Sequence, residues 1–223
     1  MTRRSSRRTP RACVVTAGPT REYVDPVRFL SNESSGLMGF SIAAALARRG
    51  HDVTLVAGPV NQPTPEGVER VDVVTAREML AALRSRWSTC EALFMAAAVA
   101  DWRPAVRRAG KWRAKDGGAT RTTLDLVRNP DVLASLTRGR RDPDRTVVAF
   151  ALETGDGVRR ARAKLASKGA DWIVLNSAAA LNARRSAVRI LGADGLEFDL
   201  ALRDKSEVAE RLADLLDLEA LGE

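Results

Sequence analysis

The segment DPVRFLSNESSGLMG, residues 25–39, decides the fold, because it separates two apolar segments of different character. The residues before it, Ala12–Ala17, have the composition of a β-strand, and those after it, Phe40–Arg49, that of a helix. A strand, a polar glycine-containing loop and a helix in this order present backbone N–H groups and the positive end of a helix to an anion. The alternative is an ordinary capped helix, since the GxxG of residues 36–39 is not the GxGxxG dinucleotide fingerprint.

The loop also carries the polar side chains that an anion site needs. Ser34 and Ser35 can cap a helix that we expect to start near Gly36. Gly36 and Gly39 would let a ligand approach the backbone closely. Asn32 offers a hydrogen-bond donor and an acceptor just outside the helix end.

The rest of the chain alternates between apolar β-type segments and amphipathic helical ones. This pattern predicts an α/β fold, a Rossmann-like, doubly wound and mostly parallel sheet covered on both faces. A basic segment, Arg103–Leu126, interrupts the pattern and predicts an inserted β-hairpin arm, and Ala187–Leu191 with Leu196–Leu200 predicts a C-terminal hairpin. The other expected strands are Asp52–Ala57, Gly67–Val74, Ala92–Ala97, Thr146–Leu152 and Asp171–Leu175, and the expected helices are Gly36–Arg49, Ala76–Trp87, Asn129–Arg138, Asp156–Lys168 and Lys205–Leu218.

Length and charge indicate one globular domain with a basic tail. A chain of 223 residues with 45% hydrophobic residues can bury one large core. Five of the eight net positive charges are arginines at positions 3, 4, 7, 8 and 11, in a segment without acidic residues, which leaves an ordinary +3 for the rest. We therefore expect residues 1–10 to be a disordered tail that binds anions weakly and residues 11–223 to be the domain.

The sequence also allows a prediction of the cellular compartment. No apolar segment reaches the length of a membrane span, and the N-terminus lacks the apolar core of a signal peptide. Cys13 and Cys90 lie within or beside apolar strand-like segments and are expected to be reduced core residues. These features predict a cytoplasmic protein that does not bind membranes.

The candidate binding and catalytic residues lie at the predicted carboxyl ends of the strands, where doubly wound sheets bind ligands. The small residues Ala96, Ala97 and Ala98 would leave room for a flat ring, and Asp101 would stand at the rim as a carboxylate or simply cap a turn. His51 is the only histidine, which argues against a histidine-based triad or metal site. The residues favour positioning and charge stabilisation of a phosphorylated substrate over covalent catalysis.

Lysines and a second helix start complete the candidate site. Lys111 and Lys115 lie in the arm, and Lys164 and Lys168 share one face of a predicted helix. Such lysines suit a polyphosphate, although solvated surface charge explains each of them separately. The sequence NPD at residues 129–131 opens a helix, with Asn129 as the expected N-cap and Pro130 in the first helical position.

These motifs together resemble the phosphopantothenoylcysteine synthetase family. The matching pieces keep the family's order and spacing over nearly the whole chain: TAGPTRE at 16–22, DPVR at 25–28, SN, SSG and MG within 31–39, AAAVADWRP at 96–104, NPD at 129–131 and ET at 153–154. The resemblance implies a ligase that joins 4′-phosphopantothenate to L-cysteine in coenzyme A biosynthesis. A nucleotide, CTP in most bacterial members, activates the carboxylate as an acyl-cytidylate with release of pyrophosphate, and cysteine then displaces CMP.

The resemblance also implies roles for individual residues. Asn32 and Lys111 would be catalytic, the first serving the cysteine step and the second stabilising charge in the activation step, while Mg²⁺ would offset the charge of CTP. The arm, carrying Lys111 and Lys115, could close over the site and exclude water. The nucleotide would contact Met95, Ala96, Ala97, Asp101, Lys111, Pro130, Asp131, Val132, Leu133, Phe150, Lys164 and Lys168, and the phosphate and substrate loop would comprise Gly18, Arg28, Ser34, Ser35, Gly36, Met38 and Gly39.

Some positions depart from the family pattern. Leu37 stands where a lysine is common, and Arg113 and Ala114 interrupt a lysine pair. Ser177 replaces an aspartate, and Arg184, Arg185 and Ser186 replace a typically acidic or asparagine-rich turn. We also expect a stand-alone synthetase, since only the tail precedes the domain. The arm has few apolar residues of its own, but Trp102, Trp112, Leu124 and Leu126 could be covered across a two-fold interface, so a homodimer is expected.

Two other functions compete with the ligase. A nicotinamide-dependent Rossmann reductase would use a similar sheet, but GxGxxG is missing and no acidic residue closes Asp52–Ala57 to hold a ribose. A specific nucleic-acid-binding protein is disfavoured because the basic charge is concentrated in the tail and no aromatic stacking platform is visible.

Overall fold

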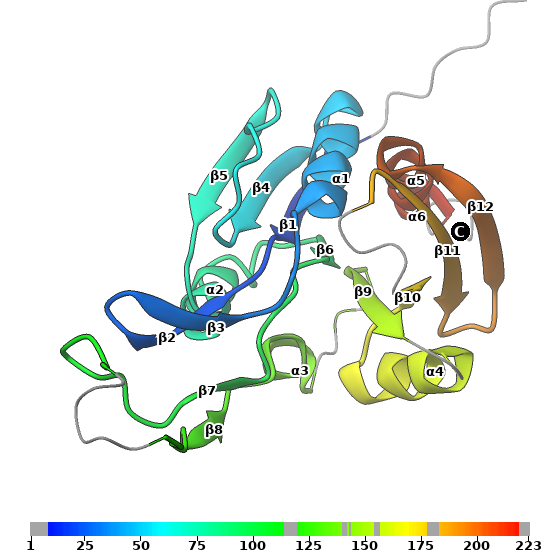
Figure 1. Ribbon diagram of the computed structural model, residues 1–223. Coiled ribbons are helices and arrows are strands. Elements are labelled where there is room, and N and C mark those ends of the chain that lie inside the picture. Colours follow the sequence, from blue (N-terminus) through cyan, green and yellow to red (C-terminus); the bar gives the residue numbers. More distant parts are fainter. Residues whose placement is uncertain are drawn as a thin grey trace, which may run out of the picture.

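The computed structural model of this protein describes residues 9–113, 120–139, 142, 144–153, 157–177 and 183–218. An eight-stranded sheet forms its centre, in the order β12-β11-β10-β9-β6-β1-β4-β5 (Figure 1). The strands from β5 to β10 pair in parallel, and β11 and β12 add antiparallel at one edge. The strand bounds are β1 Ala12–Ala17, β4 Asp52–Ala57, β5 Val68–Asp72, β6 Ala92–Met95, β9 Thr146–Glu153, β10 Trp172–Ser177, β11 Arg185–Gly192 and β12 Glu197–Asp204.

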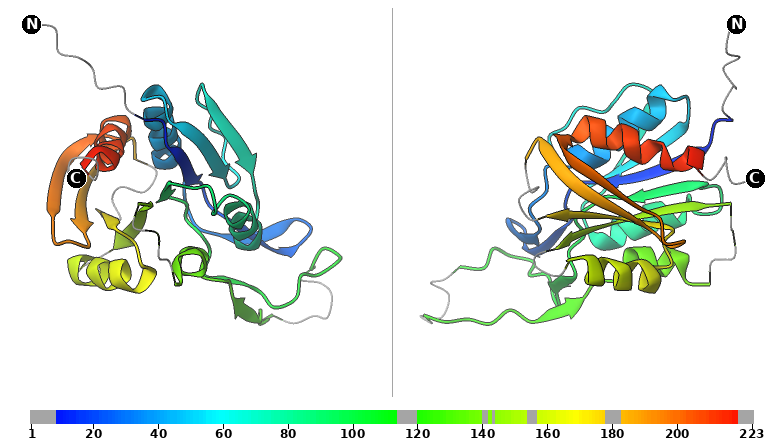
Figure 2. Two further views of the ribbon diagram at one scale, coloured as in Figure 1. Left: turned by 180° about the vertical axis from the view of Figure 1, so that it is seen from behind. Right: turned by 90° about the vertical axis from the view of Figure 1, so that its right-hand side faces the viewer.

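Helices cover both faces of this sheet (Figures 1 and 2). One face carries α1 (Leu37–Arg48), α5 (Lys205–Ala213) and α6 (Leu215–Leu218), and the other carries α2 (Ala76–Arg84), α3 (Val132–Thr137) and α4 (Gly157–Lys168). The doubly wound α/β architecture predicted from the alternating segments is therefore confirmed.

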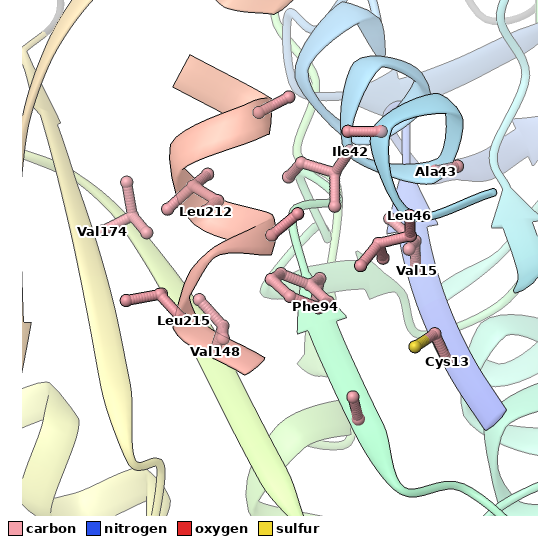
Figure 3. Close-up of a cluster of buried hydrophobic side chains, with 14 of the residues drawn as sticks. Cys13, Val15, Ile42, Ala43, Leu46, Phe94, Val148, Val174, Leu212 and Leu215 are labelled. Atoms are coloured by element: carbon pink, nitrogen blue, oxygen red, sulfur yellow. The ribbon is translucent and has the colours of Figure 1, made fainter. Parts of the chain in front are cut away.

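Two apolar clusters, one on each face, hold the layers together. On the α1/α5 face, Ile42 and Leu46 of α1 meet Leu212 of α5 over Val15 and Phe94 of the sheet (Figure 3). These side chains are completely buried, so they contribute the full hydrophobic stabilisation of about 1.5–3 kcal/mol for each large aliphatic side chain. The continuous apolar character of residues 37–47 has its explanation here, since α1 lies between the sheet and α5.

The strand order reverses at β1, which determines where a ligand can bind. From β1 the chain crosses by α1 to β4 on one side, and from β5 it returns by α2 to β6 on the other side. The carboxyl ends of β1 and β6 thus flank a topological switch point, where crossover connections leave a crevice.

The segment 25–39 is not a single loop, which corrects the prediction. Its first part closes an antiparallel hairpin of β2 (Arg21–Asp25) and β3 (Arg28–Ser31), and irregular chain follows only at 32–36. The hairpin turn forms because Asp25 Oδ1 accepts from the backbone N–H groups of Val27 and Arg28, at 2.8 and 2.9 Å. The helix then begins at Leu37, and its N-cap is Gly36 in the left-handed conformation (φ 75°) rather than a serine.

The arm is less regular than predicted. Among the described residues of the arm, strand pairing is confined to its two ends, β7 (Trp102–Pro104) and β8 (Leu126–Arg128), and residues 120–125 form no strand despite their alternating pattern. Lys115 lies outside the described residues. No helix in the described part of the chain has the length and apolar character needed to cross a bilayer.

Other elements differ mainly at their ends. The helix expected at Asn129–Arg138 begins at Val132, because Asp131 rather than Asn129 is the N-cap and accepts from Ala134 N at 3.0 Å. Pro130 therefore precedes the helix. The last helix is interrupted at Asp214 and forms α5 and α6.

Candidate functional site

A cavity of about 1080 Å³ opens at the switch point. Its volume is at the upper end of the range for small-molecule sites. Its walls come from the loop before α1, the segment after β6, the start of α3, strand β9 and helix α4. All of the sequence-predicted site residues lie in these walls except Gly18, Arg28 and Lys111.

The wall before α1 offers polar groups at a helix start. Asn32 is exposed, and its Nδ2 donates to the carbonyl oxygen of Val99 at 3.1 Å, which joins this loop to the segment after β6. Ser34 Oγ and Ser35 Oγ accept from the N–H groups of Gly36 and Leu37, at 3.3 and 3.5 Å. The serines thus stabilise the helix start, as expected, although neither is the N-cap residue.

The segment of small residues after β6 is held by buried threonines at the end of β1. Thr16 Oγ1 accepts from Ala97 N at 3.0 Å, and Thr20 Oγ1 accepts from Ala100 N at 2.9 Å. Gly18 supports the same segment from behind, because its carbonyl oxygen accepts from Ala98 N at 2.9 Å. Gly18 therefore has a structural position next to the cavity and does not line it.

On the α3/α4 side, one acidic and two basic side chains face each other. Lys168 Nζ forms an ion pair with Asp131, and Lys164 Nζ donates to the carbonyl oxygen of Phe150 at 2.8 Å. Burial, and then repulsion by Lys168, lowers the pKa of Lys164. Burial opposes ionisation of Asp131, but the hydrogen bonds from Lys168 and from Ala134 N lower its pKa overall.

Arg28 and Lys111 lie together outside the cavity. Lys111 is exposed in the arm, next to Trp112, whose carbonyl oxygen accepts from Arg28 and whose N–H donates to Asp25 Oδ2 at 3.0 Å. Burial would raise the pKa of Asp25, but the N–H groups of Val27 and Trp112 and the Arg28 guanidinium hold it below its usual value. The carboxylate of Asp25 therefore connects the arm, at Trp112, to the β2–β3 hairpin.

Sequence reasoning missed several residues of the cavity wall, including Arg128, Asn176 and Lys205, whose side chains can bind charged or polar groups. Lys205 is the first residue of α5, and burial lowers its pKa. A lysine at a helix N-terminus opposes the helix dipole, and this unfavourable placement was a signal in the sequence that could have identified it.

Other reactive groups lie away from the cavity. His51 is buried at the start of β4, where its Nδ1 accepts from Arg11 N at 3.2 Å. Burial raises the pKa of Cys13 to about 12 and that of Cys90 to about 11, so both are protonated, unreactive core thiols. Within the described ranges, no group of three or more histidine, cysteine, aspartate or glutamate side chains could hold a metal ion.

The fold and the cavity place this chain among the Rossmann-like α/β domains that bind ligands at the carboxyl ends of their strands. Residues 9–218 match the DNA/pantothenate metabolism flavoprotein C-terminal domain family, and the chain belongs to that family. The resemblance found in the sequence motifs is thereby confirmed.

Similar curated proteins are coenzyme A biosynthesis bifunctional proteins CoaBC. The protein from Mycolicibacterium smegmatis is 43% identical over 213 residues, covering 90% of this chain and 51% of that protein. The protein from Escherichia coli K12 is 43% identical over 186 residues, covering 82% of this chain and 46% of that protein. The chain thus spans about half the length of these relatives.

Solved structures agree with this assignment. The crystal structure of the C-terminal domain of a CoaBC protein matches with a TM-score of 0.82 and 31% identity, covering 98% of this chain and all of the other. A Cab2 mutant in complex with phosphopantothenate-cysteine matches with a TM-score of 0.70 and 18% identity, covering 94% of this chain and 88% of the other, which shows a shared fold.

Proposed function

We propose that this domain is a CTP-dependent phosphopantothenate–cysteine ligase of coenzyme A biosynthesis. The observation that carries the proposal is one cavity that brings together most of the residues implied by the family motifs, in a chain that belongs to the family. Reduced, buried cysteines are consistent with a cytoplasmic enzyme.

In the first step, a carboxylate oxygen of 4′-phosphopantothenate would attack the α-phosphorus of CTP, and pyrophosphate would leave. Both reactants are anions, so the step needs positive groups and helix dipoles to bring them together. Lys164 and Lys168 supply cations on the α3/α4 side, and the start of α1 supplies helix N–H groups. The backbone around Ala96 and Ala97 would hold the base of the nucleotide.

In the second step, the amine of cysteine would attack the acyl carbon, forming the amide and releasing CMP and a proton. Asn32 stands at the mouth of the cavity with its carboxamide bridged to Val99. A neutral carboxamide can hold the acyl oxygen and accept from the incoming amine at the same time.

Magnesium would enter with the nucleotide rather than occupy a resident site. The described carboxylates do not form a metal-binding group, and Mg²⁺ is commonly held by substrate phosphates with one or two carboxylates.

A homodimer would explain how Lys111 could take part in the reaction. This residue lies outside the cavity of its own chain, and a two-fold arrangement would let one arm complete the site of the other subunit. Exposed apolar side chains on the two hairpins, Phe29, Trp102, Val106 and Leu126, offer the surface for such contact.

The reductase alternative has less support. Strand β4 ends at Ala57 without an acidic residue for a ribose, and the similar curated proteins carry the coenzyme A biosynthesis name.

The test is incubation with phosphopantothenate and each nucleoside triphosphate, with and without cysteine, followed by mass spectrometry. We expect pyrophosphate and an acyl-cytidylate with CTP alone, and the cysteine amide with CMP when cysteine is added. Absence of pyrophosphate release with every nucleotide would refute the proposed function.

A further inference from the structure

Lys205 is a buried cation in the wall of the cavity. Only 8% of its surface is exposed, and it is the first residue of α5. Burial disfavours its charged form, and the positive end of the helix dipole disfavours it further. An anion bound in the cavity beside this side chain would favour its charged form.

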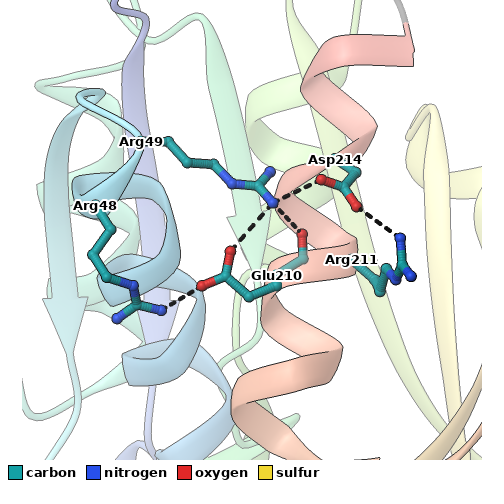
Figure 4. Close-up of polar contacts among 5 residues, drawn as sticks. All are labelled: Arg48, Arg49, Glu210, Arg211 and Asp214. Atoms are coloured by element: carbon teal, nitrogen blue, oxygen red, sulfur yellow. Dashed lines mark hydrogen bonds and ion pairs between the residues drawn. The ribbon is translucent and has the colours of Figure 1, made fainter.

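Helices α1 and α5 run side by side in the same direction, which brings their N-termini to one end. Arg49, just after α1, donates to Glu210 Oε2 at 3.2 Å and to Asp214 Oδ1 at 2.7 Å, and Arg48 donates to Glu210 Oε1 at 2.5 Å (Figure 4). The C-terminal end of α1 therefore lies beside the C-terminal end of α5. At the opposite end, Gly36 before α1 and Lys205 both line the cavity.

The other cations of the cavity come from different elements. Lys164 and Lys168 belong to α4 on the opposite face of the sheet, and Arg128 belongs to β8. Among the described lining residues, Lys205 is the only cation on the α1/α5 face. Asn176, at the end of β10, adds a carboxamide whose oxygen accepts from Ser186 Oγ at 2.9 Å.

We infer that Lys205 binds a phosphoryl group of a substrate, at the end of the cavity where α1 and α5 both begin. The inference rests on the proposed function and adds a phosphate contact on the face opposite α4. Two substrates carry suitable groups: the phosphate chain of CTP and the 4′-phosphate of phosphopantothenate. A lysine serves as a point charge for phosphate, so loss of the charge should matter more than loss of shape.

Isothermal titration calorimetry can show which substrate's phosphate Lys205 binds, by comparing the binding of four ligands to wild type and to Lys205→Met. The ligands are CTP, cytidine, 4′-phosphopantothenate and pantothenate. We expect one phosphorylated ligand to lose about tenfold to a hundredfold in affinity, as for a charge-assisted hydrogen bond, with its unphosphorylated counterpart unchanged. Arg211→Met is the matched control, because it removes an exposed cation from the same helix away from the cavity.

Unchanged affinity of Lys205→Met for both phosphorylated ligands would overturn the inference. If that variant does not fold, reductive methylation of the wild-type protein gives the answer: CTP or phosphopantothenate should protect Lys205, and its unphosphorylated counterpart should not. Equal protection by both members of each pair would also overturn the inference. These measurements need no turnover, so a wild-type protein that binds phosphates through Lys205 but forms no amide would refute only the proposed function.

Discussion

Gly39→Ala tests how tightly α1 is seated on the sheet. Gly39 is buried in the first turn of α1, where alanine is normally the better helix former by about 1 kcal/mol. Its added Cβ would lie 2.6 Å from Ala17 Cβ, 2.7 Å from Thr16 O and 3.0 Å from Ala17 Cα. All three atoms belong to β1, which is fixed by parallel pairing with β4 and β6.

This steric clash determines that Gly39→Ala lowers, and does not raise, the free energy of unfolding. Overpacking of a well-packed core costs about 1–3 kcal/mol, and contact with a central strand places this substitution at the upper end. After subtraction of the gain in helix propensity, the free energy of unfolding should fall by about 2 kcal/mol. For a domain of this size, that corresponds to a melting temperature lower by about 4–8 °C.

Thermal unfolding followed by circular dichroism measures the effect. Gly110→Ala is the matched control, since an added Cβ there meets nothing within 4 Å, and its stability should stay within about 0.5 kcal/mol of wild type. A Gly39→Ala protein as stable as wild type, or more stable, would refute the claim that close helix–strand contact requires this glycine.

Four further outcomes are expected. Asn32→Ala should accumulate acyl-cytidylate and lose cysteine transfer, seen by mass spectrometry; wild-type turnover would refute its role. Lys111→Gln should slow pyrophosphate release by about tenfold to a hundredfold, because one charge-assisted contact is lost. An unchanged rate of pyrophosphate release would show that Lys111 has no role in the activation step. Light scattering at micromolar concentration should give a dimer mass, and an active monomer would contradict the interface. Since the pKa of Asp131 is lowered on folding, its stabilisation is present above about pH 4 and lost as pH falls through the folded value, so Asp131→Asn should flatten acid denaturation in that range.

Periodicity was enough to predict the sheet, because buried parallel strands are continuously apolar and the helices between them are amphipathic. Periodicity gave wrong predictions where side-chain hydrogen bonds determine the local backbone structure. The carboxylate of Asp25 closes a hairpin by accepting from Val27 and Arg28, a device that a polar, glycine-containing sequence does not reveal. Likewise, Asn129 and Asp131 are equally good capping residues, and only the structure shows that Asn129 instead donates to Ala100 O at 2.8 Å.

The candidate site was predictable where motifs are contiguous in sequence. Residues 32–39, 95–101 and 130–133 lie in the cavity because each follows or precedes an element that ends at the switch point. Asn176 and Lys205 were missed since they reach the cavity from β10 and α5, far along the chain, and outside the contiguous motifs. The position of Lys205 depends on the packing of α5 on α1, and that of Asn176 on the pairing of β10 with β9 and β11, which are properties of the whole fold.

The packing of α1 on α5 also has a consequence for the order of folding. Ile42 and Leu46 gain their apolar neighbour Leu212 only after α5, which lies far along the sequence, has been synthesised. Contacts this distant in sequence slow folding, because the chain must close a long loop before they form. During synthesis on the ribosome, the side of α1 that packs on α5 would therefore stay uncovered until α5 has been synthesised. Substitutions in α5 should thus reduce the yield of folded protein in cells more than they reduce the stability of the purified domain.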